Sequence, residues 1–236
     1  MKTAVFTIAI GDFYQELSKI THPTIKNYAQ KIGADFIVKT ETAFPLSHYA
    51  KFEIAQLLDT YDRVLYLDTD ILVSPNMPNI FDIVPENCVG MLDESPLGYD
   101  EKFKDFLFEN APDHLANWSK TRKCYNAGVI VCSKKHRNIF RAPDKFPNHY
   151  FEQSFLNLRL LEEKAEIFDL PHQYNRMIYL DLVVPEHRLK SYIIHYAGFL
   201  EKRPVEECIK FLEKEYRMLL SQDFTEDDVK IAWATV

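Results

Sequence analysis

Residues 63–73 read RVLYLDTDILV, an apolar run interrupted by two acids, Asp68 and Asp70, one residue apart. If residues 64–67 form a strand, positions two apart at its end project to the same face, roughly 6–7 Å apart at their Cα atoms. At about 5 Å and an effective dielectric of about 20, the two carboxylates repel by on the order of 3 kcal/mol. The chain must protonate one acid, solvate both or supply a cation, and a divalent metal is the sharpest hypothesis. The alternative is a pair of turn and cap acids before Pro75.

Strand and helix patterns alternate ahead of this stretch. Residues 3–10 are a near-continuous apolar run, typical of a parallel strand buried on both faces. A helical pattern follows up to Gly33, with a capping-box pattern at Asp12 and Gln15 and with Pro23 expected to kink or restart it. A second strand over residues 34–39 and a helix capped by Ser47 come next. This order predicts an α/β fold, a Rossmann-like, mostly parallel central sheet flanked by helices, with ligands outside the carboxyl ends of its strands.

Beyond the acid pair, the chain continues with strand and helix patterns of similar length. We expect strands over residues 88–92, 128–132 and 191–195, and a helix after Pro147 that carries Phe151 and, near its start, Glu152 and Gln153. Residues 93–123 are polar, aromatic and irregular in pattern, and could cover a site. An amphipathic helix follows residue 204, and its closing acids (Asp223, Glu226, Asp227 and Asp228) form a solvated face. We predict one domain, with the catalytic part at residues 1–203 and a helical extension packed on it at 204–236.

Composition restricts the function classes. The formal net charge of −7 opposes a broad nucleic-acid footprint, which needs clustered Lys and Arg. The cysteines lack CxxC or zinc-like spacing, so we expect free, mostly buried thiols and a cytoplasmic protein: Cys88, Cys124, Cys132 and Cys208. The short apolar run after Lys2 is interrupted by Thr3 and Thr7, which favours a first strand over a signal peptide. No stretch approaches 18 consecutive apolar residues, so no transmembrane segment is expected.

Further landmarks appear in a fixed order along the chain. They are Tyr49-Ala50-Lys51, Leu67-Asp68-Thr69-Asp70, Tyr125-Asn126-Ala127-Gly128, Glu152-Gln153 through Asn157, and His195-Tyr196-Ala197-Gly198. From Val5 to about Lys202, this series resembles the retaining GT-A glycosyltransferases of family 8, the group that contains glycogenin and bacterial lipopolysaccharide galactosyl- and glucosyltransferases. The segment around Gly11-Asp12-Phe13-Tyr14 also looks like yeast-type galactosyl- and mannosyltransferases, which share the fold.

The resemblance implies a metal site. Asp70 would bind a divalent ion, Asp68 would touch both the metal and the ribose or donor sugar, and His195 would be the remaining protein ligand. Oxygen ligands with one imidazole suit Mn²⁺ or Mg²⁺ and suit zinc poorly. Such an ion would stabilise the charge that grows on a diphosphate leaving group. On its own, His195 could equally be a core or surface histidine.

The resemblance also implies contacts to a nucleotide sugar. The donor-binding positions would be Thr7, Asp12, Tyr14, Lys51, Asp68, Thr69, Ala127 and Gly198, with Tyr14 stacked on the base. Asn126, Ala127, Glu152 and Gln153 would line the donor-sugar pocket, with Asn126, Glu152 and Gln153 as the catalytic candidates. Ordinary alternatives stay open: Lys51 as a solvated helix lysine, Asp12 as a helix cap, Tyr14 as packing, and Glu152-Gln153 as an exposed first turn.

Two positions depart from the family pattern. The family usually has Asp where this chain has Glu152, which is one methylene longer. It also places Lys where this chain has Glu201, and Lys202 follows. Lys202 could make the diphosphate contact of the family's lysine only if the chain had a one-residue bulge here.

We therefore expect a metal-dependent, retaining glycosyltransferase that moves a hexose from a nucleotide diphosphate sugar, most simply a UDP-sugar, to an acceptor hydroxyl of carbohydrate type. Front-face displacement needs no enzyme nucleophile, whereas double displacement would use Gln153 or Glu152. The alternatives are a haloacid-dehalogenase-like phosphatase, which also ends a strand in Asp-x-Asp, and a nucleotide-sugar-binding protein without transferase activity. The acid pair follows the third strand rather than the first, and Leu72 is unusual for the phosphatase motif.

Overall fold

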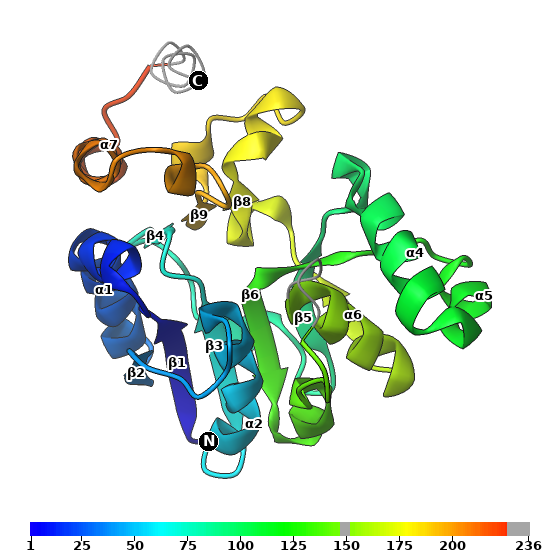
Figure 1. Ribbon diagram of the computed structural model, residues 1–236. Coiled ribbons are helices and arrows are strands. Elements are labelled where there is room, and N and C mark those ends of the chain that lie inside the picture. The colour runs from blue at the N-terminus through cyan, green and yellow to red at the C-terminus, as the bar shows by residue number, and fades with distance from the viewer. Residues whose placement is uncertain (147–151, 226–236) are drawn as a thin grey trace.

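A six-stranded sheet runs through the middle of the computed structural model, which describes residues 1–146 and 152–225 (Figure 1). Its order is β2 (Asp35–Lys39), β1 (Thr3–Ile8), β3 (Arg63–Leu67), β6 (Tyr125–Ser133), β5 (Val89–Asp93) and β7 (Ile167–Asp169). The pairings β1–β2, β1–β3 and β5–β7 are parallel, and β6 runs antiparallel to both β3 and β5. The expected mostly parallel α/β sheet is confirmed.

The antiparallel direction of β6 places its first residues beside the end of β3. Leu67 pairs with Val129, and the Asp68 N–H donates to the Gly128 carbonyl over 2.9 Å. Polar residues at the start of β6 and polar residues just after the end of β3 therefore lie at the same edge of the sheet.

The two faces of the sheet follow the alternation of side chains along its strands. Phe6 and Tyr66 belong to a core shared with α2 (Ile54–Leu57), α4 (Tyr99–Asn110) and α6 (Glu152–Glu162). Val5 and Leu65 belong to the opposite core, with α1 (Asp12–Lys31) and α3 (Ile80–Ile83). Helices thus cover both faces, as a sheet buried on both sides requires.

A second, three-stranded sheet was not expected from the sequence. Its order is β4 (Ile71–Val73), β9 (Ile193–His195) and β8 (Arg176–Met177). The stretch 63–73 therefore contains two strands in two sheets, with the acid pair at the junction. Because β4 and β9 are antiparallel and Ile71 pairs with His195, the small sheet brings His195 to that junction.

Several local predictions are wrong. Pro23 lies inside α1 and does not restart the helix, whose buried face includes Leu17, Ile25 and Tyr28 on both sides of it. Gly11, with φ of 88°, is the N-cap, and no side chain caps this end, so the Asp12–Gln15 capping box is absent.

The remaining differences concern short helices. The Ser47 helix is mainly a 3₁₀-helix, η1 (Ser47–Glu53), with Leu46 at its N-cap. Residues 93–123 contain α4 and α5 (Leu115–Trp118) rather than only irregular chain. The predictions for Pro147, Phe151, Glu226, Asp227 and Asp228 fall outside the described residues.

The C-terminal helix, α7 (Val205–Ser221), packs on α1 and contributes Cys208, Leu212 and Leu219 to a third core with Leu17. All four cysteines are free thiols, and only Cys88 is partly exposed. Among the helices of residues 1–146 and 152–225, none is both long enough and apolar enough to cross a bilayer.

Candidate active site

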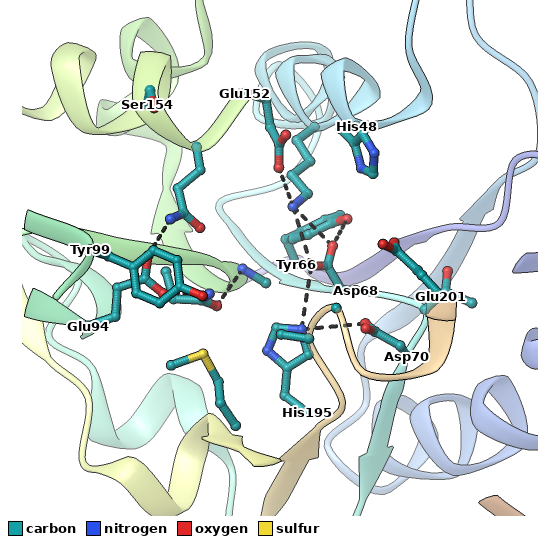
Figure 2. Close-up of a pocket in the computed structure, with 18 of the residues that line it drawn as sticks. His48, Tyr66, Asp68, Asp70, Glu94, Tyr99, Glu152, Ser154, His195 and Glu201 are labelled. Atoms are coloured by element: carbon teal, nitrogen blue, oxygen red, sulfur yellow. Dashed lines mark hydrogen bonds and ion pairs between the residues drawn. The ribbon is translucent and has the colours of Figure 1, made fainter. Parts of the chain in front are cut away.

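A cavity of about 620 Å³ opens at the carboxyl ends of β1 and β3 and the start of β6. Figure 2 shows Asp68 and His195 in its middle, Glu94 and Tyr99 on one side, and Asp70 and Glu201 on the other. Residues from both sheets and from η1, α4 and α6 line it. This is the edge at which an α/β sheet is expected to bind ligands.

Asp68, Asp70 and His195 form a compact group whose potential ligand atoms all lie within 4.8 Å of one another. His195 Nε2 lies 3.4 Å from Asp70 Oδ1 and 3.7 Å from Asp68 Oδ2. Burial lowers the pKa of His195, but Asp70 and Asp68 outweigh burial and leave it above its ordinary value. The imidazole is therefore turned toward negative charge, as a ligand of a shared cation would be.

Gly128 makes this grouping possible because it has no side chain. A Cβ atom there would lie 2.2 Å from His195 Cε1 and 2.8 Å from Asp68 Oδ2. Any larger residue at this position must displace a member of the group.

Lys51 is buried between two carboxylates rather than solvated. Its Nζ lies 2.6 Å from Glu152 Oε1 and 3.1 Å from Asp68 Oδ1, and the residue is 4% exposed. Burial lowers its pKa, but Asp68 and Glu152 more than compensate and raise it above the ordinary value. Burial likewise raises the pKa of Asp68, and Lys51 and His195 reverse that effect, so the carboxyl stays ionised.

Amide side chains form the opposite wall. Gln153 accepts a hydrogen bond from the Ala127 N–H over 3.0 Å, and its Nε2 donates to Glu94. Asn126 Nδ2 also donates to Glu94, over 3.0 Å. Burial raises the pKa of Glu94 to about 7, although both amide donors act in the opposite sense. Glu94 was missed from the sequence, because the expected strand ended at residue 92; β5 in fact ends at Asp93, so Glu94 directly follows β5 as Asp68 directly follows β3.

The sequence profile of glycosyl transferase family 8 matches residues 12–202 of the 236-residue chain. The chain belongs to glycosyltransferase family 8. This membership makes it a glycosyltransferase, with a sugar donor and an acceptor as its partners, and removes the phosphatase and non-catalytic alternatives.

Solved structures agree on the GT-A fold of this family 8 glycosyltransferase. A glycosyltransferase involved in glycosylation of the major capsid of PBCV-1 is 14% identical with a TM-score of 0.61, over 91% of this chain and 100% of that one. The galactosyltransferase LgtC, in complex with donor and acceptor sugar analogs, is 15% identical with a TM-score of 0.59, over 95% and 98%. The bifunctional glycosyltransferase WbbM is 16% identical with a TM-score of 0.54, over 84% of this chain and 46% of its own. No curated protein sequence matches.

The end of the cavity near α1 and η8 (Leu200–Lys202) contains Tyr14, Thr69, Gly198 and Glu201. The Tyr14 hydroxyl donates to Glu201, and the Thr69 hydroxyl donates to the Ile8 carbonyl. Gly198 has φ of 62°, a left-handed conformation that favours glycine.

Four residues that the sequence suggested as donor contacts do not line the cavity. Thr7 is fully buried, Asp12 is exposed, and Ala127 contributes its backbone to Gln153 from a buried position. Lys202 is exposed, whereas Glu201 lines the cavity. The structure therefore contains no bulge that exchanges these two residues.

The sequence did not single out several other lining residues. Tyr99 and Lys102 come from α4, and Met177 and Tyr179 come from the segment after Asn175. These segments carry no motif, and only the folding of α4 and β8 over the sheet brings them to the cavity.

Proposed function

We propose that this glycosyltransferase is metal-dependent and retaining, and that it transfers a hexose from a UDP-sugar to a hydroxyl of a carbohydrate acceptor. The observation that carries the proposal is the group of Asp68, Asp70 and His195 at the cavity centre, with a buried lysine beside it. Lys51 pairs with Asp68 and Glu152, and Asp70 faces His195, so three carboxylates share one permanent cation and the site has surplus negative charge. A bound diphosphate needs a further cation to approach it.

The residues present fit Mn²⁺ or Mg²⁺. Two carboxylates and one imidazole supply the hard oxygen and nitrogen ligands that these ions accept, and the ligand set contains no thiolate. Asp68, Asp70 and His195 would hold the ion, and the missing side chain at Gly128 leaves room for the imidazole. When bound, the ion would neutralise charge that grows on the departing diphosphate.

The protein's own groups would orient the donor and acceptor. Lys51 fixes Asp68 and Glu152, and it keeps its charge because its pKa is raised. Asn126 and Gln153 line the cavity, and they would read sugar hydroxyls, which gives strong discrimination against sugars that lack them. Tyr14 lies at the far end, where a base can stack.

The hydrogen bonds of Glu152 and Gln153 favour front-face displacement. Glu152 Oε1 is held by Lys51, and Gln153 uses its oxygen for the Ala127 N–H and its nitrogen for Glu94. Gln153 could attack only by losing these bonds, and the Lys51 ammonium lowers the nucleophilicity of the Glu152 carboxylate that it contacts. In the front-face route, the leaving phosphate oxygen would take the proton of the attacking acceptor hydroxyl.

The test is release of UDP from a panel of UDP-hexoses with Mn²⁺, with and without chelator. We expect slow metal-dependent hydrolysis by the wild type, loss of about 100-fold or more in Asp70→Asn, and no change in the exposed control Asp59→Asn. Metal-independent turnover, or full turnover by Asp70→Asn, would overturn the metal part of the proposal.

Stereochemistry has a separate test. Once a glycan acceptor is found by screening, proton NMR of the first product should show the donor's anomeric configuration. An inverted product refutes retention. A trapped glycosyl-enzyme on Glu152 or Gln153 refutes the front-face route.

A further inference from the structure

A chain of buried side-chain hydrogen bonds joins His195 to the amide wall of the cavity. His195 Nδ1 lies 2.9 Å from Asn175 Oδ1, and Asn175 Nδ2 donates to Asn126 Oδ1 over 2.9 Å. Asn126 and Gln153 then both donate to Glu94. The chain runs from the metal group to the proposed donor-sugar residues, and Asn175 is its one member outside the cavity lining.

The direction of these hydrogen bonds is set by the backbone. The Gly128 N–H can only donate, so the Asn126 atom 2.9 Å from it must be the oxygen. Asn126 therefore turns its nitrogen to Glu94. Its oxygen can receive only a donor from Asn175, so the Asn175 nitrogen faces it.

The same reasoning fixes which nitrogen of the His195 imidazole carries the proton. With its nitrogen committed to Asn126, Asn175 presents its oxygen to His195 Nδ1. That oxygen can only accept, so Nδ1 must carry a proton. In the neutral ring, Nε2 is then left with its lone pair, and this is the nitrogen that faces Asp68 and Asp70.

We propose that Asn175 is a positioning residue that sets the tautomer of His195, so that Nε2 is ready to bind a divalent cation. This inference rests on the proposed metal site. Asn175 is fully buried and lies outside the cavity lining, so it acts only through His195 and Asn126. Partners of this kind typically change metal affinity about 10- to 100-fold when removed.

Two substitutions separate positioning from packing. Asn175→Leu keeps similar bulk and removes both hydrogen bonds. Asn175→Asp keeps an oxygen for His195 Nδ1 whether the carboxyl is charged or protonated. The matched control is Asn157→Leu, because Asn157 is also a buried asparagine, but its hydrogen bonds go to the backbone of Tyr125 over 2.8 Å in both directions and to the Gln153 carbonyl over 2.9 Å.

The direct measurement is ¹⁵N NMR of the histidine rings of the metal-free protein, with His195 assigned by its loss in His195→Gln. Spectra are taken at a pH above its titration, where its signals no longer move. We expect a protonated Nδ1 and a bare Nε2 in the wild type, Asn175→Asp and Asn157→Leu. In Asn175→Leu the proton should move to Nε2, where Asp70 can accept it.

Binding of Mn²⁺ measured by calorimetry gives the second readout. Asn175→Leu should weaken it about 10- to 100-fold, and Asn157→Leu should leave it within about twofold. A neutral wild-type ring with its proton on Nε2, or an unchanged tautomer in Asn175→Leu, overturns the inference. If Asn175→Leu does not fold, the wild-type tautomer still decides. If the wild type binds no Mn²⁺, the proposed metal site fails, whereas a wrong tautomer with normal binding refutes the role of Asn175 alone.

Discussion

Two buried clusters of charged side chains differ in whether their charges balance. The closed cluster lies beneath α7 and consists of Arg176, Asp181, Arg188 and Glu215. Arg188 bonds Asp181 over 2.7 Å and Glu215 over 2.9 Å, and Arg176 lies 3.0 Å from Asp181. Two guanidinium groups meet two carboxylates, and each side chain is at most 3% exposed.

The open cluster lies in the cavity wall and consists of Lys51, Asp68, Asp70, Glu152 and His195. Here the carboxylates outnumber the one permanent cation. Asp68 and Asp70 keep side-chain exposures of 24% and 14%, so a ligand can reach them.

The difference separates a structural cluster from the one that we propose to be functional. The closed cluster balances its own charges, and removing a member leaves a buried charge unpaired. In our proposal, the unbalanced, open cluster is completed by a cation from outside. Surplus charge facing a cavity, rather than burial of charge as such, marks the proposed metal site.

Breaking the closed cluster should have the largest effect on stability. Arg188→Met leaves Asp181 and Glu215 without their shared partner and should lower the free energy of unfolding by about 3–5 kcal/mol. Urea denaturation at pH 7 measures this loss. Mn²⁺ affinity of the folded variant should equal that of the wild type, and a tenfold weaker affinity would show that the two clusters are not independent.

Glu94 differs from the acids of both clusters, because its hydrogen-bond donors are neutral amides of the cavity wall. Burial raises its pKa from 4.5 to about 7, so the folded protein keeps a proton that the unfolded chain releases. Stability contributed by this group therefore falls as the pH rises from about 4.5 to 7, by up to about 3 kcal/mol. Glu94→Gln should lose this slope, so its stability relative to wild type should rise between pH 5 and 8. Parallel curves in urea denaturation would refute the raised pKa.

The smallest expected effect on stability comes from two glycines on neighbouring strands. In Gly128→Ala the new methyl meets His195 and Asp68, and in Gly90→Ala it meets Val84 at 2.8 Å. Each should lower the free energy of unfolding by about 1–3 kcal/mol. Only Gly128→Ala should weaken Mn²⁺ binding, by about tenfold or more, in calorimetry. Equal losses of metal affinity would contradict the placement of the site.

The sequence predicted the parts of this structure that follow an apolar strand. Asp68 directly follows such a run, Asp70 comes two residues later and His195 ends another run, and the structure groups all three. The direction of β6 could not be predicted, because a wholly buried run has the same apolar pattern in either direction. The small sheet was missed because strands of two or three residues lack a period.

The buried polar partners were beyond sequence reasoning for a different reason. Asn175 lies between two short elements, and its role depends on hydrogen bonds to Asn126 and His195, which are distant in the sequence. Arg176 and Arg188 would be taken for surface residues from their type alone. Their burial is explained only by acids that the fold places beside them.

The central claim is that the open cluster is completed by a divalent cation that a nucleotide diphosphate then contacts. Calorimetric titration of Mn²⁺ in the presence of UDP, into the wild type, Asp70→Asn and the closed-cluster control Asp181→Asn, tests it most directly. We predict saturable binding by the wild type and by folded Asp181→Asn, and an affinity weaker by more than about 100-fold in Asp70→Asn. Equal Mn²⁺ and UDP affinities in the wild type and Asp70→Asn would contradict the claim.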